Sequence, residues 1–346
     1  MAANYWASTQ RRCWQFTKDQ LASMRNKLEE EDPGLVQMYP LPQQRHLNIY
    51  FNQQINRLGK RLGVRQQALA TAQVYIKRFY SKVEIRRTNP YLVISTAVYL
   101  ACKMEECPQH IRLVVSEARS LWPADFISLD TSKLGECEFF LISEMNSQLI
   151  VHQPYRTLAS LHSEFSMTQE EVALAWSVVN DHYMTDLPLL YPPHIIALTA
   201  ILLALVLRPS TGTPTVQSGA SAAGMAQVGN GQAGIAAAAA ALAQAQARNA
   251  VAGSLAGGNQ ALGQNPQSSQ AVQSPRDVTT ERKANDARIG KVARFVAWLA
   301  ESNVDIEAMV DSTQELISFY ECHEQYNDKI TREQIIRYVK ARGLDK

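Results

Sequence analysis

The chain has 346 residues, of which 46% are hydrophobic, and its formal net charge is +2. This length and apolar content allow two domains of ordinary size, and the near-balance of charge excludes the strongly basic surface expected of a nucleic-acid-binding protein. The five cysteines are scattered and form no C-x-x-C pair, so neither a disulfide framework nor a zinc site is expected, and a reducing compartment is favoured.

The ends of the sequence and its apolar runs give no sign of a membrane or secretory protein. The first residues lack a basic stretch followed by an apolar core, so no secretory signal is expected. The longest apolar run, residues 194–207, is too short to span a bilayer and is interpreted as a buried helix. No contact with a membrane is expected.

Residues 1–42 are expected to form an N-terminal helical segment. Tyr5 and Trp6 are placed on one helix together with Cys13 and Phe16. These two aromatic residues either pack on the body of the protein or contact a partner, and both interpretations stay open.

The first of two helical repeats is predicted over residues 43–152. Apolar residues at helical spacing run through 47–62 and stop at Gly63, and a second such run covers 69–79. Pro90 opens a third helix that is apolar on every side, which makes it the expected hub of the repeat.

Two further helices complete this repeat. They are predicted over residues 110–119 and 131–145. The inward side chains of the last one are expected to be Leu134, Phe139, Leu141, Ile142 and Met145.

The second repeat is predicted over residues 153–208 and 286–346, and the latter range includes a C-terminal helix. Thr168-Gln169-Glu170-Glu171 has the pattern of a capping box, and Pro192-Pro193 opens a second apolar helix. Later helices are expected over 289–302, 305–326 and 331–342, the last beginning with a capping box at Thr331. Since no stretch alternates like a strand, the predicted fold is all-α, with two five-helix repeats.

Residues 209–285 interrupt this second repeat. From residue 209 to residue 275 the only charged residue is Arg248, and there is no aromatic residue. Such a composition buries too little apolar surface to offset the entropy of ordering. A disordered insertion is therefore predicted.

A lysine followed by two acids ends the apolar helix of the first repeat, as Lys103-Met104-Glu105-Glu106. A cation at the end of such a helix needs a partner, either within the chain or on another protein. The spacing alone leaves both open.

This motif resembles the lysine-x-glutamate-glutamate sequence that ends the third helix of a cyclin box. Glu138, with Leu141, Ile142 and Met145 behind it, resembles the glutamate of the fifth helix in that family. Within the cyclins the chain is most similar to the C type of the Mediator kinase module, and its insertion resembles fungal members. That likeness rests on residues 4–6, 65–72, 75–80, 136–139 and 149–156.

The resemblance implies two five-helix cyclin boxes and a regulatory subunit without chemistry or cofactor of its own. In the family the paired lysine and glutamate grip a loop of a cyclin-dependent kinase, a role that falls here on Lys103 and Glu138, with an internal ion pair as the alternative. Residues in positions of apolar contact are Met104, Ile142 and Leu149. The set of kinase-binding candidates is completed by Glu105, Glu106, Tyr5 and Trp6, and for the two acids a solvated surface is the alternative.

The implied partners are a cyclin-dependent kinase of the Mediator kinase module and the other subunits of that module, in the nucleus. The expected role is to activate the kinase and so regulate RNA polymerase II transcription, without direct binding of nucleic acid. Two other functions stay open, namely a general transcription factor with the same repeats and an adaptor that binds the kinase without activating it. The region 149–156 is also similar to cyclin H, so the choice between the two kinases is open as well.

An enzyme is disfavoured because no protein-kinase or phosphate-loop motif occurs in context. The sequence G-x-G-x-x-G at residues 229–234 lies in the insertion with no strand before it, so a nucleotide site is not expected there.

Overall fold

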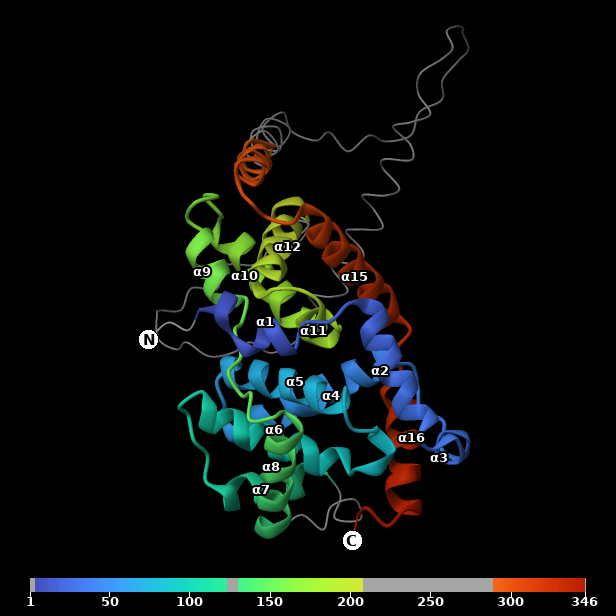
Figure 1. The fold of residues 1–346 in the computed structure, drawn as a ribbon. Helices are drawn as coiled ribbons and strands as arrows, with labels where there is room; N and C mark the ends of the chain where they lie inside the picture. The colour runs from blue at the N-terminus through green and yellow to red at the C-terminus, as the bar shows by residue number, and fades with distance from the viewer. Residues whose placement is uncertain (1–3, 123–129, 208–288, 346) are drawn as a thin grey trace, which may run out of the picture. The chain divides into compact units, whose positions relative to one another are not determined.

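The computed structural model describes residues 4–122, 130–207 and 289–345, and every regular element in these ranges is a helix (Figure 1). The prediction of an all-α chain is thereby confirmed for the described residues. The predicted insertion, residues 209–285, lies outside them. Among the described helices none combines the length and the apolar content needed to cross a membrane.

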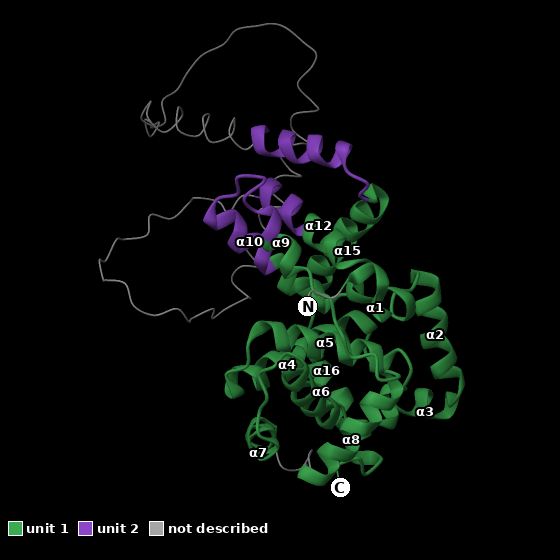
Figure 2. Cartoon of the chain, turned by 60° about the vertical axis from the view of Figure 1, so that its left-hand side comes forward, with its two compact units in different colours: residues 1–159, 178–199, 305–346 green, residues 160–177, 200–304 purple. Residues whose placement is uncertain are grey.

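The chain divides into two compact units (Figure 2). One comprises residues 1–159, 178–199 and 305–346, and the other comprises residues 160–177 and 200–304. The predicted boundaries of the two repeats stay a prediction. The whole predicted first repeat, residues 43–152, belongs to the first of these units.

The N-terminal segment consists of several short helices. They are η1 (Tyr5–Ala7), α1 (Thr9–Cys13), α2 (Lys18–Glu30) and α3 (Pro33–Met38). Asn4 is the N-cap of η1, and Ser8 is the N-cap of α1. The prediction of one helix carrying Tyr5, Trp6, Cys13 and Phe16 is therefore wrong, because a capping serine interrupts the run.

The first repeat contains the five predicted helices in order. They are α4 (Gln44–Leu62), α5 (Gln66–Tyr80), α6 (Pro90–Met104), α7 (Ile111–Leu121) and α8 (Thr131–Glu144). Gly63 ends α4 with a φ of +62°, a backbone conformation that glycine adopts without strain. The apolar α6 packs against all four of the other helices, so its predicted role as the hub is confirmed.

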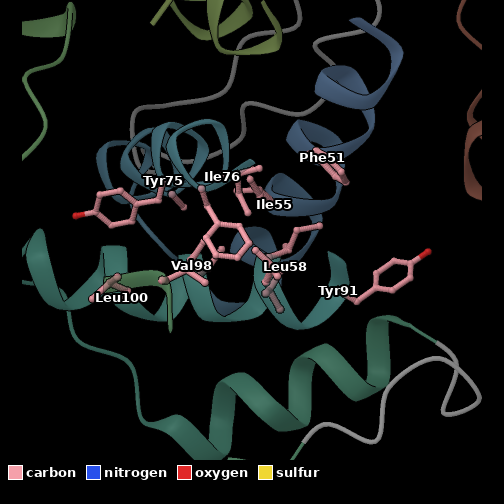
Figure 3. Close-up of a cluster of buried hydrophobic side chains, with 14 of the residues drawn as sticks. Phe51, Ile55, Leu58, Tyr75, Ile76, Tyr91, Val98 and Leu100 are labelled. Carbon is pink, nitrogen blue, oxygen red and sulfur yellow. The ribbon is translucent and has the colours of Figure 1, made fainter. Parts of the chain in front are cut away.

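The core of this repeat lies between α4, α5 and α6. Figure 3 shows Ile55 and Leu58 of α4 meeting Ile76 of α5 and Val98 of α6. Each of these side chains is at most 3% exposed. Burial of such side chains stabilises the fold by about 1.5–3 kcal/mol each.

Leu134 and Leu141 of α8 are buried as predicted, as is Met145, the residue that caps the end of this helix, and Ile142 is half-buried. Phe139 was predicted to point inward, and this is wrong, because its side chain is 76% exposed. An α-helix turns roughly 100° per residue, so Phe139 lies roughly 140° around the helix from Leu134 and faces away from the core.

The later elements follow the predicted order. They are α9 (Tyr155–Leu161), α10 (Gln169–Asp181), η4 (His182–Met184), α11 (Leu187–Leu190), α12 (Pro193–Val206), a helix over residues 289–301, α15 (Ile306–Glu324) and α16 (Asp328–Ala341). The capping box at Thr168 forms, since its hydroxyl accepts from the Glu171 amide and the Glu171 carboxylate accepts from the Thr168 amide.

The predicted capping box at Thr331 is wrong. Helix α16 begins three residues earlier, where the Asn327 side chain accepts from the amides of Lys329 and Ile330. Thr331 lies inside the helix and is buried. Asparagine is at least as favourable an N-cap as threonine, and Asn327, the earlier of the two residues, caps the helix.

Candidate functional site

Lys103 and Glu138 form an ion pair between α6 and α8. Lys103 is in the last turn of α6, and Glu138 is in the middle of α8, where the two helices pack together. The Glu138 side chain is 13% exposed, whereas that of Lys103 is 39% exposed. The Lys103 ammonium also lies 4.5 Å from the centre of the Tyr99 ring. The internal ion pair therefore exists, and it still leaves the ammonium open to solvent.

An ammonium carries three hydrogen-bond donors. Within the described part of the chain, Glu138 is the ion-pair partner of Lys103 and Tyr99 is its aromatic neighbour. The carboxylate holds the ammonium in place, and donors remain available for acceptors from outside. An internal pair and a contact with a partner are thus compatible in this geometry.

The turn after α6 is fixed by side chains of α5. The Glu105 carboxylate accepts hydrogen bonds from Thr71 Oγ1 and Gln67 Nε2, each at 2.6 Å. Arg65, at the start of α5, donates through Nη2 to the carbonyl oxygens of Glu105 and Glu106. Glu105 therefore holds the turn in place, while the Glu106 side chain is exposed.

The segment after α8 is held in the same way. Arg78 Nη1 of α5 donates to the carbonyl oxygen of Gln148 at 2.7 Å, and the Tyr75 hydroxyl donates to that of Leu149 at 2.6 Å. Burial lowers the pKa of Arg78 to about 10, so it is still a cation at neutral pH. Leu149 is consequently fixed and half-buried, and Ile150 beside it is 56% exposed.

Apolar side chains accompany the ion pair along both helices, since Met104 follows Lys103 and Ile142 lies one turn after Glu138. Met104 is 40% exposed, and Ile142 and Leu149 are half-buried against the core. Phe139 lies three residues before Ile142 on α8, a spacing at which side chains are neighbours on a helix surface. We define the α6–α8 face as Lys103, Met104, Glu138, Phe139, Ile142 and Leu149.

Phe139 is the residue of this face that the sequence pattern wrongly predicted to point toward the core. Its exposure was already implied by the period of α8, since Leu134, Leu141 and Met145 share one arc that excludes it. Phe139 directly follows Glu138, the partner of Lys103, and a large exposed aromatic side chain of this kind is typical of a protein interface.

Tyr5 and Trp6 make contacts outside the α6–α8 face. The Tyr5 hydroxyl donates to Gln15, and its ring meets that of His152. The Trp6 ring lies 5.4 Å from that of His194 and is 55% exposed. Tyr5 therefore packs on the protein itself, and Trp6 keeps a free surface.

The sequence model of the family "Cyclin, N-terminal domain" matches residues 20–150 of this chain, which include every residue of the α6–α8 face. A protein of Neurospora crassa named RNA polymerase II holoenzyme cyclin-like subunit is 66% identical over 354 residues, with all of both chains covered. The chain belongs to the cyclin family. A second protein of the same name, from Chaetomium globosum, is 62% identical over 368 residues, again with full coverage.

The cyclin fold is also seen in a solved structure. A chain in the structure of the CAK complex of Chaetomium thermophilum bound to ATP-gamma-S matches 97% of this chain and 87% of its own length, with a TM-score of 0.54 and 18% identity. This agreement concerns the fold alone. Cyclins are regulatory subunits rather than enzymes, and this chain is such a subunit.

Proposed function

We propose that this cyclin is the regulatory subunit of a cyclin-dependent kinase of the Mediator kinase module, and that it binds and activates that kinase in the nucleus through the α6–α8 face. The name shared by the relatives from Neurospora crassa and Chaetomium globosum, RNA polymerase II holoenzyme cyclin-like subunit, supports a role in RNA polymerase II transcription. Other subunits of the module are further partners in this proposal.

The observation that carries the proposal is the state of Lys103. Its ammonium is fixed by Glu138 and remains 39% exposed. Backbone carbonyl groups of a kinase loop can accept from the remaining donors, and such a contact requires no particular sequence in the loop. Charge-assisted hydrogen bonds of this kind contribute about 1.5–3 kcal/mol each.

Apolar contacts supply the rest of the binding free energy in this proposal. Met104, Ile142 and Leu149 receive apolar side chains of the kinase helix that follows the gripped loop, and Phe139 extends the same surface. Docking there favours the kinase conformation in which its own lysine–glutamate pair forms, which is a shift of population.

The other candidates divide by their surroundings. The exposed Glu106 and Trp6 are assigned to contacts at the margin of the kinase interface. Glu105 and Tyr5 are assigned to positioning, because their polar groups already bond to Gln67, Thr71 and Gln15.

The test is affinity purification of the full tagged chain from nuclear extract, with wild type beside Lys103→Glu. The reversed charge faces Glu138 and repels carbonyl oxygens, so a loss of about 2–4 kcal/mol in binding is expected, as at other interface hot spots. Lys329→Glu is the control, because that lysine is 84% exposed on α16. Melting curves followed by circular dichroism check that each variant is folded.

Wild type and Lys329→Glu are expected to retain a co-purifying kinase activity, and a folded Lys103→Glu is expected to lose it. Equal recovery with all three would remove Lys103 from the interface. A kinase that co-purifies without gaining activity would favour the adaptor. Recovery of promoter DNA without any kinase would favour the general transcription factor, which the net charge of +2 disfavours.

A further inference from the structure

Two cysteines flank the turn that carries Lys103. Cys102 is in the last turn of α6 and is 0% exposed, and Cys107 follows three residues after the helix ends and is partly exposed. Both are free thiols. The resemblance to the family assigns no role to either of them.

The backbone brings these two residues together. The Cys107 amide donates to the carbonyl oxygen of Cys102 at 2.9 Å, and the Glu106 amide donates to that of Lys103 at 3.3 Å. Glu106 adopts a φ of +54°. These features define a Schellman motif, which a contact between the side chains at the positions of Cys102 and Cys107 frequently accompanies.

The side chains agree with this backbone geometry. Cys107 packs against the core cluster that contains Cys102. Burial, together with the neighbouring Cys107 thiol, raises the pKa of Cys102 to about 12. The other described cysteines, Cys13, Cys137 and Cys322, come from α1, α8 and α15. Cys102 and Cys107 are therefore a vicinal dithiol within one turn.

We propose that Cys102 and Cys107 are a redox modification site, at which a hydroperoxide converts the two thiols into an intramolecular disulfide that encloses Lys103. Cys107 reacts first because it is the accessible thiol, and the thiolate is the reactive form. Its sulfur attacks one oxygen of hydrogen peroxide, the O–O bond breaks, and a sulfenic acid and hydroxide result.

The second step uses Cys102. Its sulfur attacks the sulfenic sulfur of Cys107, the S–S bond forms, the S–O bond breaks, and the Cys102 proton leaves with the hydroxide as water. Overall the two thiols lose two electrons and two protons, and the peroxide is reduced to two molecules of water. Cytosolic and nuclear disulfides of this transient kind are usually redox-sensing, and a cellular dithiol reductant would reverse the reaction.

The test is mass spectrometry of the full chain after titration with hydrogen peroxide and trypsin digestion. Trypsin cuts after Lys103, between the two cysteines, so a disulfide joins the peptides of residues 88–103 and 104–112. The expected result is this linked pair, at a mass 2 Da below the sum of the two, separated by dithiothreitol. The kinase is absent from this assay, so its outcome does not depend on the proposed function.

Two variants make the test specific. Cys107→Ser changes a partly exposed side chain and is expected to abolish the linked pair. Cys137→Ser changes a buried thiol of α8 and is expected to leave the pair intact. Oxidation of wild type to a sulfinic or sulfonic acid at Cys107 without a linked pair would overturn the proposal, as would linkage of Cys107 to any other cysteine.

Discussion

Two ion pairs of the first unit show how differently a charge can be surrounded. Arg25 donates to both carboxylate oxygens of Asp186 at 2.8 Å, and Asn48 adds a third hydrogen bond at 3.0 Å. Although burial raises the pKa of Asp186, the hydrogen bonds and charge of Arg25 outweigh it and hold that pKa below its ordinary value. The charge of the buried Lys77 acts in the same direction. This carboxylate has its partners within the chain.

Lys103 and Glu138 form the contrasting pair. Its carboxylate is as covered as that of Asp186, but the ammonium has one carboxylate partner and one aromatic ring and remains exposed. The same α6–α8 face also carries accessible apolar side chains, among them Met104 and Phe139. The difference suggests a simple rule for this molecule. A charge whose hydrogen bonds are all made within the chain stabilises the fold, whereas a charge with free donors is available to bind a partner.

Asp181 extends the comparison, since it lies five residues before Asp186 and forms no ion pair with any cation in the part of the chain that the structure describes. The Tyr320 hydroxyl donates to its carboxylate at 3.2 Å. Burial raises the pKa of Asp181 to about 7, an effect that the tyrosine hydrogen bond only partly offsets. Two aspartates with almost the same depth of burial thus have pKa values shifted in opposite directions, and the presence of Arg25, Lys77 and Asn48 around Asp186 accounts for the difference.

The largest expected effect comes from removing the carboxylate of the Arg25–Asp186 pair. Asp186→Ala leaves Arg25 and the buried Lys77 without their anion, and the free energy of unfolding should fall by about 3 kcal/mol. Urea unfolding followed by circular dichroism measures this change. A loss as small as that of the Glu138 variant described below would contradict the rule.

The next effect concerns pH and Asp181. Its folded pKa, about 7, is above the unfolded value of 3.8, so the folded state binds more protons between these values. The free energy of unfolding should therefore fall as the pH rises from about 4 to about 7. Asp181→Asn should remove this slope and raise stability at pH 8 by roughly 2 kcal/mol.

Thermal unfolding between pH 4 and pH 8 measures this effect. Asp186→Asn serves as the matched control, because it removes a charge that has a cation and should lower stability at pH 8. A parallel pH dependence in wild type and Asp181→Asn would show that other groups determine the slope.

A smaller effect is expected at the apolar surface of α8. Phe139→Ser should weaken binding of the purified kinase about tenfold, or about 1.4 kcal/mol, and leave stability unchanged. The side chain is 76% exposed, so little packing is lost. Surface plasmon resonance gives the affinity, and thermal unfolding gives the stability.

Phe140→Ser is the matched control for that prediction. Phe140 packs edge-on against Phe79 of α5, with 5.2 Å between the ring centres. Its replacement should lower stability and leave the affinity for the kinase within about twofold. The reverse pattern in the two variants would move the interface to the other side of α8.

The smallest effect is expected for the Lys103–Glu138 pair itself. Glu138→Gln removes the partner of an exposed lysine, and the free energy of unfolding should fall by less than about 1 kcal/mol. The difference from wild type should shrink further in 1 M salt, because screening acts on exposed charges. A loss of several kcal/mol in urea unfolding would mean that this pair, like that of Asp186, maintains the fold.

Much of the helix pattern could be predicted because its signals are local. The period of α4, the Gly63 stop, the proline at the start of α6 and the capping box at Thr168 each depend on residues within a few positions. The wrong predictions are also local in origin. Asn327 and Thr331 are both residues that can cap the start of a helix, and they lie four positions apart. The prediction chose Thr331, whereas the helix begins after Asn327.

The sequence by itself determined that the chain is helical, that α6 is the hub, and that Lys103 needed a partner. Only the tertiary structure decided which partners the charges find. Thr71 and Gln67 hold Glu105, Arg78 holds the segment of Leu149, and Glu138 leaves the Lys103 ammonium exposed. The reason is physical, since helix formation depends on near neighbours, whereas burial and hydrogen bonding of a side chain depend on residues brought together from distant parts of the chain.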